Sequence, residues 1–386
     1  MKDNAVFIYS DELLHYKFAD NHPFNQKRLL LTVDLLHSLD FLAKENIVAP
    51  RYATEEELLL IHDGRYIEAV KKAGEGLLKQ SDWEKFGLGT EDTPIFSKMH
   101  EASSLIVGGT LTAVDAVMSG NSLHALHLGG GLHHSLPGKA SGFCIYNDCA
   151  VAIQYLRKKY NAKVLYIDTD AHHGDGVQWS FYDDPNVCVV SIHETGRYLF
   201  PGTGAIYERG HGHGYGYTFN VPLDAFTEDD SWLEAYSAVL TAVADYFKPD
   251  ILLTQNGVDA HYYDPLTHLS TTIAIYREIP KFAHEIAHRY CEGRWVAVGG
   301  GGYDIWRVVP RAWSYLWFEM NDQRNITGEI PADWLHRWQP EAPVALPTNW
   351  EDPTPLYPAI PRKNEIEQKN KKTVETVLQI IHNHSS

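Results

Sequence analysis

The sequence contains few cysteines, four among 386 residues, at positions 144, 149, 188 and 291. No two of them form a CxxC pair, and their spacing matches no disulfide framework. We therefore expect reduced thiols and a cytoplasmic protein. An apolar run of 18 residues is also missing, so we expect no membrane-spanning helix. The first residues, MKDNAVFIYSDELL, are too polar for a secretory leader.

Positive charge is scarce as well. The chain has 33 Lys and Arg against 50 Asp and Glu, which gives a formal net charge of −17. Nucleic acids and anionic membrane surfaces need clustered basic residues, so we expect neither as a partner. The length suits one large α/β domain or two ordinary ones, and a hydrophobic content of 44% is enough for a large core.

Helical and strand-like patterns alternate along the chain. Apolar residues recur with helical spacing in five segments: 24–39, 96–120, 147–160, 229–247 and 277–293. The short apolar or β-branched runs that alternate with them span 4–10, 123–128, 163–170, 186–194, 250–256 and 294–300. This alternation predicts an α/β protein with a mainly parallel central sheet flanked by helices.

Polar and glycine-rich segments follow four of these strand-like runs. They are GGGLHHS (with His133 and His134), DTDAHHGDG (168–176), GVDAHYYD (with Asp259) and GGGGYD (with Tyr303). Ligands of parallel α/β sheets bind beyond the carboxyl ends of the strands. One such loop would mean little, but four together predict a functional site at this edge.

The segment DTDAHHGDG suggests a metal site. Residues two apart in an extended chain point the same way, so Asp168, Asp170 and His172 would share one face. Asp170 and His172 could hold a metal together with Asp259 from another strand, leaving positions open as a catalytic site requires. Asp168 and Asp175 would then remain as acceptors that fix the tautomers of nearby histidines.

The remaining histidines show no comparable pattern. The segment ERGHGHGYGY, which contains His211 and His213, predicts a flexible glycine-rich turn at the surface. The histidines in helical or near-helical stretches are interpreted as ordinary packing or surface residues; they are His37, His62, His100 and His288.

These motifs resemble the histone deacetylase superfamily, and most of all a class I-like bacterial branch associated with acetoin utilization. The resemblance runs from HPFNQKR (22–28) to about residue 310. Besides the segments above, it is carried by ASGFCIYND (140–148) and FPGTG (200–204). It implies an arginase/deacetylase-like three-layer fold with a mainly parallel central sheet flanked by helices.

The resemblance also implies roles for single residues. The ligands of a catalytic Zn²⁺, with Fe²⁺ as the alternative metal, would be Asp170, His172 and Asp259. The catalytic groups would be the tandem histidines His133 and His134, their partners Asp168 and Asp175, and Tyr303, which would polarise the acetyl carbonyl. Asp92 would bind substrate as a carboxylate at the rim, and Gly142 would offer its backbone carbonyl. Phe143 and Phe200 would form the tunnel walls. Gly301 would lie beside the metal, and Arg28 would belong to an acetate channel.

Two structural K⁺ sites are implied in the same way. One would be formed by Asp168, Asp170, His172, Ser191 and Ile192. The other would include Phe181, Asp184 and Val187.

The activity implied is removal of acetyl groups from acetyl-lysine side chains of proteins by a zinc-dependent lysine deacetylase. The branch is linked to acetoin and acetate metabolism, which makes acetyl-CoA synthetase a candidate substrate. An alternative is a deacetylase of acetylpolyamines or other small acetyl amides. A non-catalytic protein that binds acetylated ligands is disfavoured, because all the catalytic groups are kept. A binuclear arginase-like site is disfavoured because Gly257 stands where a second-metal carboxylate is needed.

The last part of the chain differs in composition. Residues 340–361 hold seven prolines and should run extended over the surface, whereas 365–383 has the pattern of an amphipathic helix. We expect residues 1–320 to form the deacetylase catalytic domain. Residues 321–386 would form a C-terminal extension, a Pro-rich arm plus a helix, that packs on this domain or on a neighbouring molecule.

Overall fold

A single parallel sheet forms the centre of the molecule. The computed structural model describes residues 4–323 and 326–385. Within these residues eight strands are paired in the order β2-β1-β3-β8-β7-β4-β5-β6, and every ladder is parallel. The strands are β1 (Ala5–Ile8), β2 (Ile47–Val48), β3 (His124–His127), β4 (Val164–Asp168), β5 (Val187–Glu194), β6 (Thr218–Leu223), β7 (Ile251–Gln255) and β8 (Trp295–Val298).

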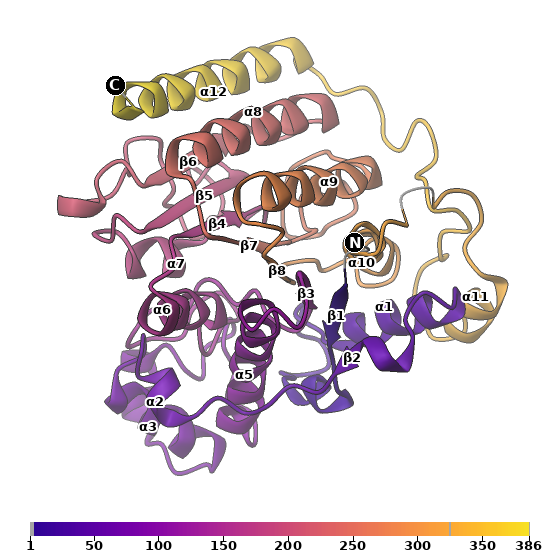
Figure 1. Ribbon diagram of the computed structural model, residues 1–386. Coiled ribbons are helices and arrows are strands. Elements are labelled where there is room, and N and C mark those ends of the chain that lie inside the picture. Colours follow the sequence, from indigo (N-terminus) through magenta and orange to yellow (C-terminus); the bar gives the residue numbers. More distant parts are fainter. Residues whose placement is uncertain (1–3, 324–325, 386) are drawn as a thin grey trace.

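Helices cover both faces of this sheet and complete three layers. Figure 1 shows α8 (Asp229–Phe247) and α9 (Ile273–Tyr290) on one face, with α5 (Met99–Met118) and α6 (Asp148–Tyr160) on the other. The remaining α-helices are α1 (Lys27–Ser38), α2 (Glu55–Leu58), α3 (Gly64–Gly74), α4 (Gln80–Trp83), α7 (Asp175–Ser180), α10 (Val309–Met320), α11 (Ala332–Trp338) and α12 (Lys363–Ser385). The predicted three-layer α/β fold is confirmed. Across 4–323 and 326–385, no helix has the length and apolar character needed to cross a bilayer.

Burial explains which strands could be predicted from the sequence pattern. All residues of β3, β4, β5, β7 and β8 are buried, and β4, β7 and β8 are mainly apolar, as expected of central parallel strands. The sequence pattern missed β6, which contains Asn220 and Pro222. Because β6 lies at the edge of the sheet, a proline can be accommodated there without breaking a central ladder.

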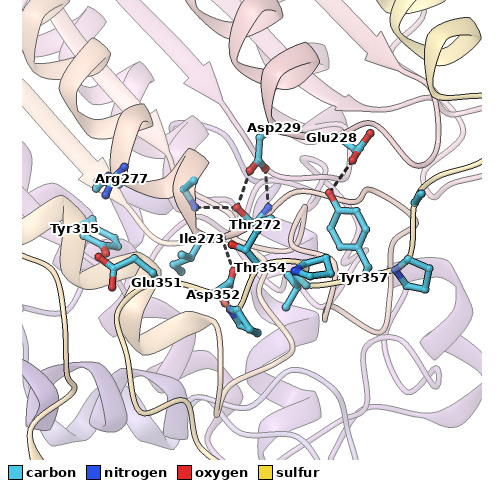
Figure 2. Close-up of a pocket in the computed structure, with 16 residues that line it drawn as sticks. Glu228, Asp229, Thr272, Ile273, Arg277, Tyr315, Glu351, Asp352, Thr354 and Tyr357 are labelled. Carbon is cyan, nitrogen blue, oxygen red and sulfur yellow. Dashed lines mark hydrogen bonds between the residues drawn. The ribbon is translucent and has the colours of Figure 1, made fainter.

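The C-terminal extension lies against the same body. Helix α12 runs alongside α8 in Figure 1, and Asn370 of α12 donates hydrogen bonds to Thr227 and Ser231 at the start of α8. The Pro-rich segment precedes α12 in the chain. Its residues 351–359 line a cavity of about 750 Å³ together with residues of α8, α9 and α10. Figure 2 shows how this segment is tied down there, with the hydroxyl of Tyr357 donating to Glu228.

Candidate metal centre and catalytic pocket

Four neighbouring strands deliver the candidate site to one edge of the sheet. The strands β3, β8, β7 and β4 are consecutive in the sheet order, and all point the same way. The loops after them therefore meet at their carboxyl ends. They bring together His133 and His134 after β3, Asp170 and His172 after β4, Asp259 after β7 and Tyr303 after β8.

Two carboxylates and one imidazole converge at this edge of the sheet. Ligand atoms of Asp170, His172 and Asp259 all lie within 4.8 Å of one another, and all three residues are buried. Nδ1 of His172 is 3.2 Å from Oδ1 of Asp170 and 2.9 Å from Oδ2 of Asp259. The other oxygen of Asp170 accepts hydrogen bonds from the backbone of Gly301 over 2.6 Å and from the side chain of Gln255 over 2.8 Å.

The electrostatics of this trio suit a divalent cation. Burial, together with the negative charge of Asp170, raises the pKa of Asp259 to about 7. Burial opposes charge on His172, yet hydrogen bonds to the two carboxylates raise the pKa of that histidine well above its ordinary value. Two buried carboxylates at such short range repel each other, and a bound cation would relieve that repulsion. One nitrogen and two carboxylate oxygens are also a donor set that zinc and similar metals accept.

Gly301 is required where it lies. A Cβ atom on this residue would stand 2.2 Å from Oδ2 of Asp259 and 2.9 Å from Oδ2 of Asp170. Any side chain would therefore enter the space of the metal ligands. This explains how a glycine-rich turn can lead the chain past the metal centre to Tyr303.

The tandem histidines form two imidazole–carboxylate pairs above the trio. Nδ1 of His133 lies 2.7 Å from Oδ2 of Asp168, and Nδ1 of His134 lies 2.8 Å from Oδ1 of Asp175. The two Nε2 atoms are 3.0 Å apart. Both histidines are thus fixed by a carboxylate on one nitrogen, while their other nitrogens point toward the same place.

Their surroundings separate the proton affinities of the two histidines. Burial alone would lower the pKa of His133, but the charges of Asp168 and Asp170 raise it to about 9. Burial and the positive charge of His133 lower the pKa of His134, although Asp175 opposes this effect. Near neutral pH His133 is therefore a cation and His134 a neutral imidazole. A neutral imidazole held by a carboxylate is suited to act as a general base.

Tyr303 brings a phenol close to the candidate metal ligands. Its ring centroid lies 6.4 Å from that of His172, and its backbone N–H donates to Oδ2 of Asp264 over 2.8 Å. Burial and the nearby Asp170 raise the pKa of Tyr303 well above its ordinary value, so the hydroxyl stays protonated and can donate. The sequence analysis missed Asp264, although it lies in the same HYYDP segment as the predicted ligand loop.

Two phenylalanines line the approach to these groups. The ring of Phe143 is 5.7 Å from that of Tyr303, and the ring of Phe200 is 5.0 Å from that of His134. Phe200 is 44% exposed, so part of its ring faces solvent. One ring contacts His134 and the other Tyr303.

Gly142 and Asp92 lie together close to His134. The backbone N–H of Gly142 donates to Oδ2 of Asp92 over 2.7 Å. A Cβ on Gly142, whose φ is +53°, would be only 2.3 Å from Cδ2 of His134. The structure thus brings this loop against His134. It also gives Asp92 a partner within the chain, which the sequence analysis did not anticipate.

Arg28 lies behind the pocket and is fully buried. Its Nη1 donates to the carbonyl of Gly302 over 3.1 Å, and its guanidinium packs on the rings of Phe24 and Trp313, at 4.4 and 4.9 Å from their centroids. Burial lowers the pKa of Arg28 to about 10, which still leaves it charged at neutral pH. A buried cation directly behind Tyr303 could attract an anion such as acetate.

The residues expected to bind K⁺ are also brought together in two groups. Asp168 of β4 pairs in register with Ser191 of β5, and Ile192 follows Ser191 on that strand. The strand β4 leads on to Asp170 and His172. Phe181, Asp184 and Val187 are linked in turn, because Asp184 N–H donates to Phe181 O and Val187 N–H donates to Asp184 O. Binding of K⁺ at either place stays a prediction.

One contact of the site region could not be found from the sequence. Asp352, in the Pro-rich arm, accepts a hydrogen bond from Nε2 of His261, two residues after Asp259, over 2.9 Å. It also accepts from Nη2 of Arg311 over 2.8 Å and from the backbone of Ile273 over 2.8 Å. An isolated aspartate between prolines gives no local sign of such a role.

Comparison with known proteins agrees with the resemblance found in the sequence. The model of the histone deacetylase domain matches residues 22–320. The acetoin utilization protein AcuC of Bacillus subtilis strain 168 is 63% identical over 381 residues, spanning 99% of this chain and 98% of that protein. AcuC of Staphylococcus aureus strain MRSA252 is 52% identical over 368 residues, 95% of each chain.

Solved structures agree with the fold described above. The crystal structure of an HDAC homolog from Aquifex aeolicus has a TM-score of 0.83 at 29% identity, covering 96% of this chain and 100% of that one. An HDAC homolog complexed with SAHA has a TM-score of 0.84 at 31% identity, with the same coverage.

Proposed function

Because this chain belongs to the histone deacetylase family, we propose that it is a zinc-dependent amidohydrolase that removes acetyl groups from acetyl-lysine side chains of proteins. The observation that carries the proposal is the arrangement of two carboxylates and one imidazole at metal-ligand spacing, next to two imidazole–carboxylate pairs and Tyr303. The names of the relatives support a role in acetoin utilization, and acetyl-CoA synthetase is the substrate we propose in that context.

Asp170, His172 and Asp259 would hold the metal, which we propose to be Zn²⁺ with Fe²⁺ as the alternative. When bound, such an ion acts as a Lewis acid toward the acetyl carbonyl and lowers the pKa of water. We propose in addition that K⁺ occupies the two groups around Ser191 and Asp184. The four cysteines are buried free thiols, which supports a cytoplasmic location.

His134 would move the proton during hydrolysis. Its Nδ1 is held by Asp175, so its neutral Nε2 can take a proton from the attacking water while the water oxygen bonds to the carbonyl carbon. The same proton would then pass to the amine nitrogen of lysine as the C–N bond breaks. His133, kept cationic by Asp168, would add positive charge beside the reacting atoms without taking up the proton.

Tyr303 would donate its hydroxyl hydrogen bond to the carbonyl oxygen as negative charge develops on it. Phe143 and Phe200 would hold the aliphatic stem of the lysine and exclude water around it. The backbone carbonyl of Gly142 would accept the N–H of the acetamide. Each of these roles acts on a different part of an acetyl-lysine side chain.

The class of substrate depends on the rim of the pocket. A carboxylate has about four acceptor sites, and Oδ2 of Asp92 accepts the backbone N–H of Gly142. The remaining acceptor capacity of Asp92 could bind backbone N–H groups on either side of an acetyl-lysine. An acetylpolyamine has no peptide N–H groups to offer there.

The test compares kcat/KM for an acetyl-lysine peptide, free acetyl-lysine and an acetylpolyamine on the Zn²⁺-loaded protein. We expect the peptide to be the best substrate. Asp92→Ala should lower its kcat/KM by at least about 10-fold, which corresponds to about 1.4 kcal/mol, and Asp92→Asn should lie between. Glu91→Ala, an exposed neighbour, is the matched control and should change nothing.

Each other outcome points to a different assignment. If an acetylpolyamine is the best substrate, amide hydrolysis stands but the protein substrate does not. If Asp92→Ala impairs all three substrates equally, Asp92 acts through the position of Gly142 and not on the peptide. If acetylated ligands bind but none is hydrolysed, the protein is a binding module and the proposal fails.

A further inference from the structure

Three histidines gather at the edge of the sheet opposite the pocket. His124 is the first residue of β3, whereas His133 and His134 follow the carboxyl end of that strand. All strands are parallel, so His124 lies at the amino edge. The length of β3 alone, about 10 Å, keeps this edge apart from the catalytic metal ligands. Helix α9, which carries His284 and His288, packs on β7 and β8 beside it.

The spacing of the three imidazoles approaches that of metal ligands. One ring nitrogen from each of His124, His284 and His288 lies within 4.8 Å of the other two. Ligand nitrogens around tetrahedral zinc are about 3.3 Å apart, given Zn–N bonds of about 2.0–2.1 Å. The difference between these two spacings is at most about 1.5 Å. His288 is exposed, so a change in its side-chain rotamer is the movement that would close this gap.

The scaffold holds the other two histidines in place. His284 and His288 are four residues apart and share one face of α9. His124 pairs in register with Trp295 of β8, and the indole of Trp295 stacks on the ring of His284 at 6.1 Å between centroids. Strand, helix and indole therefore fix where the imidazoles of His124 and His284 stand.

A buried carboxylate orients His284. Oε1 of Glu319, on α10, lies 2.8 Å from Nδ1 of His284, and the two side chains are 6% and 5% exposed. A hydrogen bond from Nδ1 to a carboxylate places the lone pair of His284 on Nε2, the ring nitrogen through which it would bind a metal. Metal-binding histidines nearly always have such a partner, and the partner raises their basicity as ligands.

We propose that His124, His284 and His288 form a second metal site for a divalent transition metal such as Zn²⁺, with Glu319 as the residue that positions His284. Three imidazoles favour Zn²⁺, Cu²⁺ or Ni²⁺ over Mg²⁺ or Ca²⁺, which prefer oxygen ligands. The exposed His288 gives the ion a path from solvent and leaves a coordination position for water. The site is independent of the proposed deacetylase activity.

The test counts metal on the intact chain. The protein is stripped with a chelator, reloaded with excess Zn²⁺, desalted and measured by elemental analysis. We expect two zinc ions per chain in the parent and one in His288→Ala, with kcat/KM on an acetyl-lysine peptide unchanged. His336→Ala, which removes an exposed histidine from α11, is the matched control and should keep both ions. Asp259→Ala should lose the other, catalytic ion and keep this one.

A second measurement separates a designed site from weak surface binding. Competition with a chromophoric zinc chelator gives the affinity of each site, and Glu319→Gln should weaken only the second by about 10–100-fold. Equal zinc content in the parent and in His288→Ala overturns the proposal. So does an unchanged affinity in Glu319→Gln, because the histidines would then be a packing cluster. Loss of the catalytic ion in the parent would instead count against the proposed function.

Discussion

Oδ2 of Asp352 lies 2.9 Å from Nε2 of His261, although 91 residues separate the two in sequence. The same carboxylate binds Arg311 and the first residue of α9. One aspartate of the Pro-rich arm thus ties the loop that carries Asp259 to two helices. Burial raises the pKa of Asp352, but the hydrogen bond and charge of His261, together with Arg311, hold it well below its usual range.

Asp352→Ala should destabilise the protein strongly. The substitution leaves Arg311, whose side chain is 2% exposed, as a buried cation without this carboxylate. Removing one partner of a buried ion pair typically costs about 3–5 kcal/mol of unfolding free energy. Urea unfolding of the metal-loaded protein should show a midpoint well below that of the parent. Glu351→Ala, at the exposed neighbouring position, should stay close to the parent, and equal midpoints for both variants would contradict the role of Asp352.

His134→Ala should lower kcat on an acetyl-lysine peptide by about 10²–10⁴, the usual contribution of a general acid–base residue. The metal should remain bound, because His134 is not among the three ligand residues. Steady-state kinetics and elemental analysis on the same preparation test both statements. Near-normal turnover would mean that the proton is carried by another group, and His133 would be the first to examine.

Tyr303→Phe should reduce kcat by about 10²–10³ and leave KM nearly unchanged. The phenol hydrogen bond strengthens as the carbonyl becomes an oxyanion, so its loss falls on the transition state and not on substrate binding. The backbone N–H that anchors this residue to Asp264 is kept in the variant. A rise in KM with an unchanged kcat would show that Tyr303 only positions the substrate.

His62 should make the protein less stable in mild acid. Burial lowers the pKa of His62 from 6.5 to about 4, and its Nε2 accepts the N–H of Asn147 at the start of α6. Above pH 6.5 the histidine is neutral whether folded or not, so it adds no pH dependence. Between 6.5 and 4 the unfolded chain binds a proton that the folded chain does not. The free energy of unfolding should therefore fall as pH falls, by up to about 1.4 kcal/mol per pH unit from this residue.

The measurement compares the parent with His62→Gln, which keeps a donor and an acceptor but does not titrate. Urea unfolding between pH 4.5 and 8 should show a shallower decline for the variant. His37→Gln, at an exposed position on α1, is the control and should follow the parent. If the parent and His62→Gln lose stability in parallel, His62 is protonated in the folded protein and the reasoning fails.

Local sequence patterns were sufficient to predict a residue's role where that role depends only on its own helix, strand or loop. The runs that became β4, β7 and β8 are mainly apolar because both faces of a central parallel strand are buried. The polar groups after them mark the carboxyl ends, which is why the loops of the pocket could be named from the sequence. The strand β6 was missed because Asn220 and Pro222 are tolerated only by its edge position, and an edge is a property of the whole sheet.

The sequence by itself determined the fold class and the loops that carry the proposed site, because strand burial and the spacing of Asp170 and His172 are local properties. Only the tertiary structure decided which of these groups interact. The order β3-β8-β7-β4 places Asp259 beside His172, and unequal surroundings give His133 and His134 opposite pKa shifts. Asp352 and the cluster of His124 and His284 were invisible in the sequence. Contacts between residues far apart along the chain follow from how the elements pack, which no local periodicity encodes.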